Sequence, residues 1–153
     1  MFFAKLARKA GLLLMGAILL LAPLTAGQAA ETWNGVIEGS LSYPSDFIPP
    51  DMTVCAENLA TQQRYCTQKH LKGPKYTYKM GYKLKVPPGN YHVYAYLPDP
   101  AKYGAGFPRD YRAYYSKFVT CGMSVNCKDH SPITVRVKRG KVVSGVDPMD
   151  WYR

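Results

Sequence analysis

The sequence predicts an all-β fold, an antiparallel sandwich of about seven to nine strands, from three observations. Short apolar or alternating segments recur between turn-forming residues after residue 30. No segment in that region has the apolar period of an amphipathic helix. The composition includes 12 prolines, 13 glycines and 13 tyrosines, which suits strands joined by tight turns. Strands are expected at residues 36–42, 53–58, 64–67, 76–80, 83–86, 91–97, 112–119, 133–138 and 142–146.

Residues 1–30 are typical of a cleavable export signal. Three basic residues precede an apolar run at residues 10–24, and the small residues of TAGQAA follow it. The run is too short for a membrane anchor, and no other segment approaches the roughly 20 apolar residues of a spanning helix. We therefore expect an exported protein, periplasmic or extracellular, without a transmembrane anchor. Its mature chain is expected to be one domain at residues 31–153.

The chain is strongly basic, with 20 Lys and Arg against 10 Asp and Glu and a formal net charge of +10. Three basic and no acidic residues lie within the predicted signal, so the mature chain keeps a net charge of +7. Such a surface favours anionic partners, for example phosphate-bearing glycans, acidic lipid headgroups or nucleic acid. Export argues against nucleic acid. The alternative is a basic, soluble protein without one particular anionic target.

The four cysteines form an even set, which in an exported chain predicts two disulfides. If residues 60–61 form the tip of a hairpin, Cys55 faces Cys66 and Glu57 faces Arg64. Opposed cysteines lie within the distance that a disulfide requires. An opposed Glu and Arg add about 0.2 to 1 kcal/mol to the pairing. One register thus accounts for both pairs.

The other two cysteines, Cys121 and Cys127, are then expected to pair across the short segment CGMSVNC. A metal site that combines them with Asp129 and His130 is the alternative, but its spacing matches no standard zinc pattern. Asp129 and His130 are instead expected to shape the turn before the next strand. No metal and no cofactor are expected.

The segment VPPGNYHVYAYLP begins with turn-forming residues and continues as a strand. If residues 87–90 form a four-residue hairpin loop, the strands on either side pair with each other. One face of this hairpin is then apolar and forms core: Tyr82, Leu84, Val86, Tyr91, Val93, Ala95 and Leu97. The opposite face is the candidate ligand-binding surface: Lys83, Lys85, His92, Tyr94 and Tyr96. Its rings would stack on sugars and its lysines would pair with phosphates or carboxylates, although ordinary strand surface is the alternative.

Four segments carry a family resemblance: GVIEG at 35–39, VCAEN at 54–58, VPPGNYHV at 86–93 and ITVRVKRG at 133–140. Together they resemble the carboxypeptidase regulatory-like, transthyretin-like β-sandwich family. The resemblance spans most of the mature chain and implies that fold and an accessory or binding role. The chain departs from the family at residues 98–131, which are longer than the family pattern, and functions particular to this protein are expected there.

Three further segments are less regular. Residues 98–110 are expected to form one long exposed loop. The aromatic and basic run at 111–118 has large side chains on both faces of a strand, so the sequence does not orient it. Trp151 and Tyr152 are expected to close the core as a hydrophobic plug.

Catalysis is not expected. The chain has no G-x-S-x-G motif and only three histidines, and the predicted disulfides leave no reactive thiol. The resemblance does not imply the hydrolase branch of the fold either, because the Tyr-Arg-Gly-Ser ending of that branch is missing. The first functional hypothesis is a secreted, non-enzymatic binding or accessory module for carbohydrate or an anionic envelope polymer. The second is a structural or protein–protein interaction domain that pairs through a sheet edge or an aromatic surface.

Overall fold

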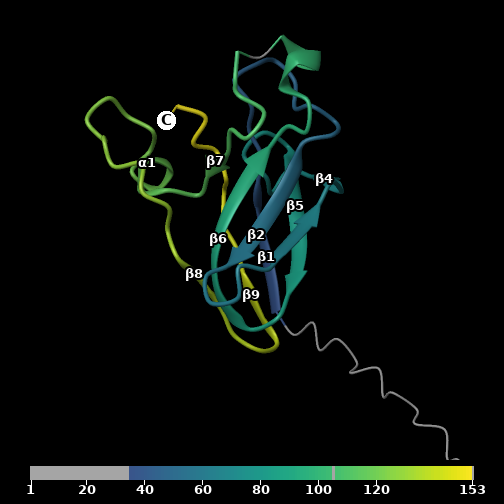
Figure 1. Ribbon diagram of the computed structural model, residues 1–153, viewed down its shortest axis with the longest axis vertical. Helices are drawn as coiled ribbons and strands as arrows, with labels where there is room; N and C mark the ends of the chain where they lie inside the picture. Colours follow the sequence, from purple (N-terminus) through teal and green to yellow (C-terminus); the bar gives the residue numbers. More distant parts are fainter. Residues whose placement is uncertain (1–34, 105, 153) are drawn as a thin grey trace, which may run out of the picture. The chain divides into compact units, whose positions relative to one another are not determined.

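The computed structural model describes residues 35–104 and 106–152, so the predicted export signal at residues 1–30 lies outside the described residues. Within the described ranges the chain is an all-β sandwich of two sheets (Figure 1). The first sheet has the strand order β4-β5-β1-β9: His70–Lys72, Met80–Val86, Gly35–Ser40 and Lys141–Val143. The second sheet has the order β3-β2-β6-β7, with β8 also paired to β6: Arg64–Thr67, Thr53–Asn58, Gly89–Tyr96, Ala113–Tyr114 and Val135–Val137.

The hairpin of β2 and β3 has the predicted register. Cys55 lies opposite Cys66 and Glu57 lies opposite Arg64. The expected Glu57–Arg64 ion pair does not form among the described residues, because the Glu57 carboxylate pairs with Arg112 instead. The side-chain oxygen of Asn58 accepts hydrogen bonds from the next turn, from the backbone N–H groups of residues 60 and 61 at 2.9 and 3.1 Å. An asparagine in this position stabilises a tight turn. The local sequence therefore fixes both the turn and the register of the hairpin.

The core lies between the two sheets and contains every residue that the sequence assigns to the inner face of the two strands around residues 87–90. Each of these side chains is at most 5% exposed: Tyr82, Leu84, Val86, Tyr91, Val93, Ala95 and Leu97. The two tyrosines satisfy their hydroxyl groups inside the protein, because Tyr82 donates to the Val146 carbonyl at 2.8 Å and Tyr91 donates to the Pro87 carbonyl at 2.7 Å. Burial of these side chains is the main source of stability.

The predicted pairing of β5 with β6 is wrong. β5 pairs with β1 and β4, whereas β6 pairs with β2, β7 and β8 in the other sheet. Both edges of β5 are occupied, so no edge is left for β6. Pro87 and Pro88 lack backbone N–H groups and have a restricted φ. They form the short connection that carries the chain from β5 in one sheet to β6 in the other.

Two predicted strands are also wrong or shortened. Residues 76–79 form turns, and the strand lies earlier, at β4. Lys79 adopts a φ of 56° in this turn, and the ring of Tyr76 covers Gly81, where an added Cβ would be 2.2 Å from that ring. The alternating pattern of residues 76–80 therefore reflects the burial of one ring over a glycine, not a strand. The predicted strand at 112–119 is reduced to β7 and the short helix α1, Lys117–Thr120.

Residues 98–110 and the C-terminal residues pack together at one end of the sandwich. The loop contains a 3-10 turn, Pro100–Tyr103, and is anchored, because Tyr103 donates a hydrogen bond to Asp51 at 2.6 Å. Phe107 packs against Trp151 with ring centroids 5.6 Å apart. The plug prediction holds for Trp151, which is 4% exposed, and fails for Tyr152, which is 60% exposed. No helix among the described residues is long and apolar enough to cross a membrane.

Candidate ligand-binding site

The structure does not bring the five residues of the sequence-predicted platform together. Lys83 and Lys85 alternate with buried residues of β5 and lie on the outer face of the first sheet. Lys83 is also engaged there, with its Nζ 3.6 Å from Glu38. His92, Tyr94 and Tyr96 alternate with buried residues of β6 and lie on the outer face of the second sheet. The single platform is therefore wrong, because its two halves belong to different sheets.

The aromatic half of the predicted platform is joined by an aromatic neighbour from β7. Tyr94 lies opposite Tyr114 in the sheet, and their ring centroids are 5.4 Å apart. Tyr96 lies 6.2 Å from Tyr94, and His92 meets Tyr114 edge to face at 6.4 Å. Tyr94 is only 1% exposed, so it forms the floor of the group, whereas Tyr96 and Tyr114 are half-buried. Burial raises the pKa of the Tyr94 hydroxyl, and a hydrogen bond with Arg64 and nearby arginine charges oppose that rise.

Arginines, not lysines, provide the positive charge beside these rings. The guanidinium carbon of Arg112 lies 4.5 Å from the centroid of the Tyr94 ring, which is a cation–π contact. Its Nη1 atom is also 3.5 Å from Glu57 Oε2 and 3.5 Å from the Tyr114 hydroxyl. Three partners thus hold Arg112 in place. We name this surface the arginine–aromatic face, formed by Arg64, Tyr94, Tyr96, Arg109, Arg112 and Tyr114.

Two open hollows lie on the arginine–aromatic face. One has a volume of about 390 Å³ and lies between Pro108 and Tyr114. The other, of about 190 Å³, is lined by all three arginines together with Tyr94, Tyr96 and Asp110. Arg112 and Asp110 contribute to both hollows. A ligand that extends across the face would therefore contact both.

The chemistry of the arginine–aromatic face suits an anionic, extended ligand. Among the described residues, no carboxylate lies within ion-pair distance of Arg64 or Arg109, and both side chains are exposed. Guanidinium groups bind carboxylates and phosphates through two parallel hydrogen bonds. The part-exposed rings of Tyr96 and Tyr114 offer flat apolar surface next to them. The face thus combines charge recognition with ring contacts.

A disulfide lies directly beside the floor of this face. Cys55 is opposite Cys66 on one side and opposite Tyr94 on the other. The Cys55–Cys66 bond is present, as is the predicted Cys121–Cys127 bond, and no cysteine is free. The first bond links β2 to the edge strand β3, which carries Arg64. It therefore restricts the position of one of the three arginines.

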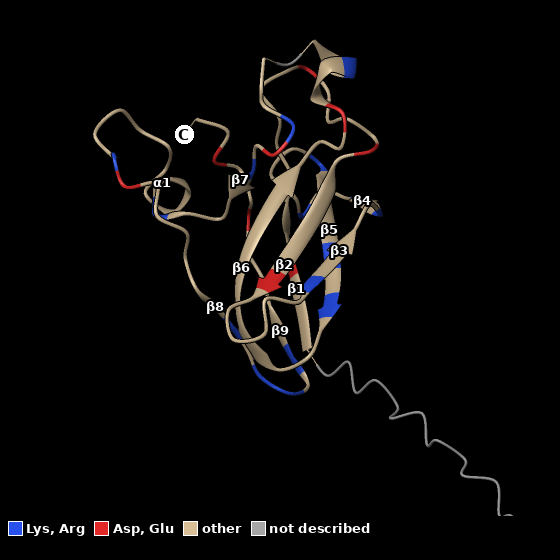
Figure 2. Ribbon diagram, in the orientation of Figure 1, with Lys and Arg blue, Asp and Glu red and all other residues tan. Residues whose placement is uncertain are grey.

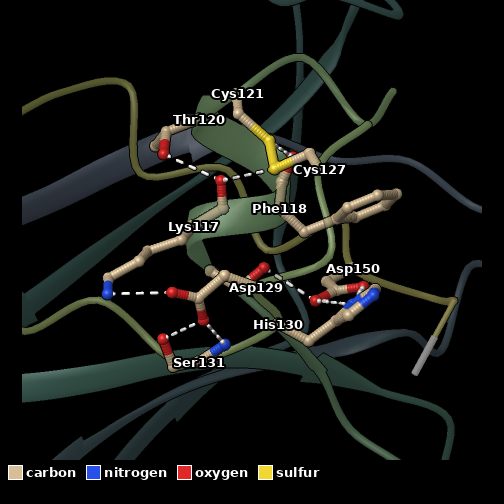
Figure 3. The surroundings of a disulfide bond; sticks show 10 residues. Lys117, Phe118, Thr120, Cys121, Cys127, Asp129, His130, Ser131 and Asp150 are labelled. Atoms are coloured by element: carbon tan, nitrogen blue, oxygen red, sulfur yellow. Dashed lines mark hydrogen bonds and ion pairs between the residues drawn. A yellow bond between two sulfur atoms is a disulfide. The ribbon is translucent and has the colours of Figure 1, made fainter. Parts of the chain in front are cut away.

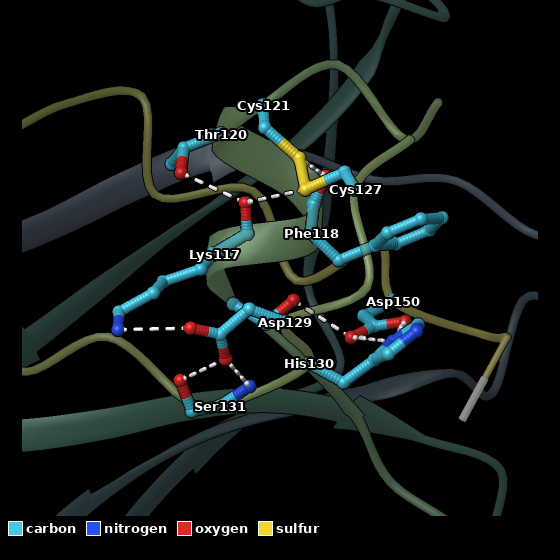
Figure 4. A network of polar contacts seen from close by, with 10 residues as sticks. Lys117, Phe118, Thr120, Cys121, Cys127, Asp129, His130, Ser131 and Asp150 are labelled. Atoms are coloured by element: carbon cyan, nitrogen blue, oxygen red, sulfur yellow. Dashed lines mark hydrogen bonds and ion pairs between the residues drawn. A yellow bond between two sulfur atoms is a disulfide. The ribbon is translucent and has the colours of Figure 1, made fainter. Parts of the chain in front are cut away.

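The second disulfide closes the loop that follows α1 (Figure 3). Near this disulfide, Asp129 accepts hydrogen bonds from Ser131 and forms an ion pair with Lys117, whose Nζ lies 2.9 Å from Asp129 Oδ2. These contacts lower the pKa of the Asp129 carboxyl. Asp129 therefore shapes the turn that precedes β8, as the sequence predicts. Figure 4 shows the same polar network with His130 directed at Asp150.

Asp150 is fully buried and has two side-chain partners. The hydroxyl of Ser116 donates to it at 2.7 Å, and Nδ1 of His130 lies 2.9 Å from it (Figure 4). The ring of Phe118 stacks on His130 with centroids 4.5 Å apart. Ser116 is directed at Asp150 and not at the histidine, so these residues do not form a nucleophile–base pair. Their role is to attach the C-terminal residues to the sandwich.

Sequence reasoning missed the three arginines and Tyr114 as members of one face. Arg112 and Tyr114 are two residues apart and share a strand face, which was a usable signal. The sequence predicts that Arg64 lies opposite Glu57, but it does not predict which strand pairs with the other edge of β2. That strand is β6, in which His92 lies opposite Glu57.

No family model matches this chain, and no curated protein sequence matches it. The fold class therefore comes from the structure itself, which is an all-β sandwich. The two disulfides fit an exported protein, because such bonds persist in oxidising compartments.

Proposed function

We propose that this protein is an exported, non-enzymatic binding module that holds carbohydrate or an anionic envelope polymer on its arginine–aromatic face. The observation that carries the proposal is the position of Arg112 over the Tyr94 ring, beside a hollow that two further arginines also line. Three guanidinium groups gathered around one hollow are suited to a repeating anionic chain. The two-sheet fold is compatible with the carboxypeptidase regulatory-like, transthyretin-like family that four sequence segments resemble.

The three arginines would contribute to binding in two different ways. Arg112 is fixed by its contacts with Glu57, Tyr94 and Tyr114, so it needs little further ordering when a ligand binds. Arg64 and Arg109 have no carboxylate partner within the described ranges and supply the free charge. A carboxylate or phosphate would pair with these two side chains while a sugar ring lies against Tyr96.

The charge of the rest of the molecule supports association with an anion. Figure 2 shows basic residues along β5 and around the turn between β8 and β9. This second basic region would attract a polyanion from a distance. The described residues of β5 and of the turn between β8 and β9 include only one ring, that of the buried Tyr82. We assign to it an electrostatic contribution, and to the arginine–aromatic face the specific contacts. Export to the periplasm or the extracellular space would bring the protein to such polymers.

A polyuronate tests this proposal. The full chain, produced by export so that its disulfides form, is titrated with sodium alginate and, as the neutral control, with dextran. We expect alginate to bind and its affinity to fall as salt rises from about 50 to about 200 mM, because ions screen exposed charges. Dextran should bind more weakly and without that dependence. Equal, salt-independent binding of the two polymers, or binding of neither, would contradict the proposal.

A second candidate function is protein–protein interaction through an aromatic surface. Phe47, Tyr78 and Tyr152 are exposed at 50%, 58% and 60%, which is unusual for large rings in one region of a monomer. Pairing through a sheet edge is less favourable, because edge strands β3, β4 and β9 have only four, three and three residues. Sedimentation over a range of concentrations distinguishes the two: a dimer that does not bind alginate favours this second function.

A further inference from the structure

A separate pocket lies away from the arginine–aromatic face, where the loop after β1 meets the C-terminal residues. It has a volume of about 440 Å³, which is within the range of small-molecule sites. Four rings contribute to its lining: Tyr43, Phe47, Tyr78 and Tyr152. They come from three stretches of the chain that are distant in sequence, so the fold itself assembles the group. We name this site the aromatic pocket.

The rings of the aromatic pocket keep much of their surface open. Phe47, Tyr78 and Tyr152 are each at least half exposed, while Tyr43 is held from behind by Trp151 at a centroid distance of 5.3 Å. Phe47 lies 6.5 Å from Tyr43 at an interplanar angle of 53°. Tyr43 and Phe47 are therefore inclined to one another and are not stacked. Four rings, three of them at least half exposed, thus line one hollow.

The charge of the aromatic pocket differs from that of the rest of the protein. Asp46 is the only charged residue in its lining, and no Lys, Arg or His lines it. Within the part of the chain that the structure describes, the Asp46 carboxylate has no ion pair and no hydrogen bond. Its charge is therefore unpaired in a chain whose formal net charge is +10. The complementary ligand is a cation.

We propose that the aromatic pocket binds an alkylated ammonium group of the trimethylammonium type. The negative faces of aromatic rings attract such a cation. Its methyl groups also fill apolar space, whereas a strongly hydrated primary ammonium group would keep water molecules in that space. Asp46 supplies the opposing charge at the edge of the pocket. An uncharged apolar ligand would instead lie beside this carboxylate and remove part of its water without compensation.

Choline chloride and its uncharged isostere, 3,3-dimethylbutan-1-ol, test the assignment by calorimetric titration of the full chain. The two molecules have the same shape and differ in charge. We expect choline to bind, and the alcohol to bind at least about tenfold more weakly, since a desolvated cation–π contact and an opposing charge both disappear. Equal affinities, or no heat with either compound, would overturn the proposal.

Two variants locate the choline site. Asp46→Asn and Phe47→Leu are each expected to weaken choline binding by about twofold to thirtyfold, the range of one cation–π or charge contact. The matched control is Asp99→Asn, which removes one exposed carboxylate outside the pocket and should leave the affinity unchanged. Asp46 lies at the surface, so its variant should keep the native melting temperature. An Asp46→Asn protein that melts normally and binds choline as tightly as Asp99→Asn would place the cation elsewhere.

Phosphatidylcholine vesicles distinguish the source of the headgroup. Co-sedimentation that free choline displaces would support a lipid headgroup as the ligand. Retention of choline binding without vesicle binding would support a small soluble ammonium compound. A dimer whose formation is abolished by Phe47→Leu, together with no response to choline, would show instead that a second copy of the chain occupies the pocket and would refute the assignment. Alginate binding should be unaffected by choline, so the two sites fail or succeed independently.

Discussion

Trp151 provides a direct test of how the C-terminal residues contribute to the fold. Its ring is 4% exposed and packs against Tyr43 and Phe107 at centroid distances of 5.3 and 5.6 Å. Its indole N–H donates to the Ser42 carbonyl at 2.8 Å. Replacing it by alanine should cost about 3–5 kcal/mol, the usual range for a buried aromatic side chain. That is a large share of the roughly 5–15 kcal/mol by which a domain is stable.

The neighbouring aromatic residue is the control. Tyr152 is 60% exposed, so Tyr152→Ala should change the free energy of unfolding by less than about 0.5 kcal/mol. Urea unfolding followed by circular dichroism measures both variants without relying on tryptophan fluorescence. Trp151→Phe should fall between them, because it keeps part of the packing but leaves the Ser42 carbonyl without its donor. Equal shifts of the urea midpoint for Trp151→Ala and Tyr152→Ala would refute the described docking of the C-terminus.

Three further predictions follow from burial and bonding. Leu84→Asp should unfold the domain and Lys85→Asp should not, because residue 84 lies in the core and residue 85 lies on the exposed face of β5. Similar melting temperatures for the two variants would contradict this. Burial raises the pKa of the Asp147 carboxyl, although a hydrogen bond from the Ser40 N–H opposes that rise. The contribution of Asp147 to stability is therefore complete below the pKa that Asp147 has in the unfolded chain, and it is lost as pH rises through its pKa in the folded protein. Asp147→Asn should therefore raise the urea midpoint more near about pH 7 than near about pH 3, and the reverse order would disprove the sign. Finally, a thiol reagent added to unfolded, unreduced protein should find no reactive sulfur, whereas two would exclude one of the disulfides.

The core was predictable because burial follows the two-residue period of a strand. Leu84 and Val93 point inward in the structure, as they do in the predicted hairpin. Alternation identifies the buried side of each strand but does not say which strand is its neighbour. Two strands that face each other across the core show the same pattern as two strands that pair in one sheet. The error in the partner of β5 therefore left the list of core residues intact.

The hairpin of β2 and β3 was predictable for a different reason. Its cysteines and its turn lie within a few residues of one another, so local chemistry decides the register. The arginine–aromatic face depends instead on contacts between distant segments. Arg64 and Arg112 meet beside Tyr94 only because β6 lies between β2 and β7. The sequence contains the residues of the face but no local signal for this strand order.

A comparison of two double variants, each lacking two positive charges, tests most directly whether the arginine–aromatic face binds the polymer. The double variant Arg64→Gln/Arg109→Gln removes two exposed positive charges of the arginine–aromatic face, one in β3 and one in the loop before β7. The double variant Lys83→Gln/Lys85→Gln removes two exposed positive charges from β5 in the first sheet. Both are compared with the parent chain in alginate titrations at one salt concentration. We expect the arginine variant to lose at least about tenfold in affinity, since a hydrogen bond to a charged group contributes about 1.5–3 kcal/mol. The lysine variant should lose only a small electrostatic contribution. An equal loss in both, or a greater loss in the lysine variant, would show that net charge or the first sheet, and not the arginine–aromatic face, governs binding.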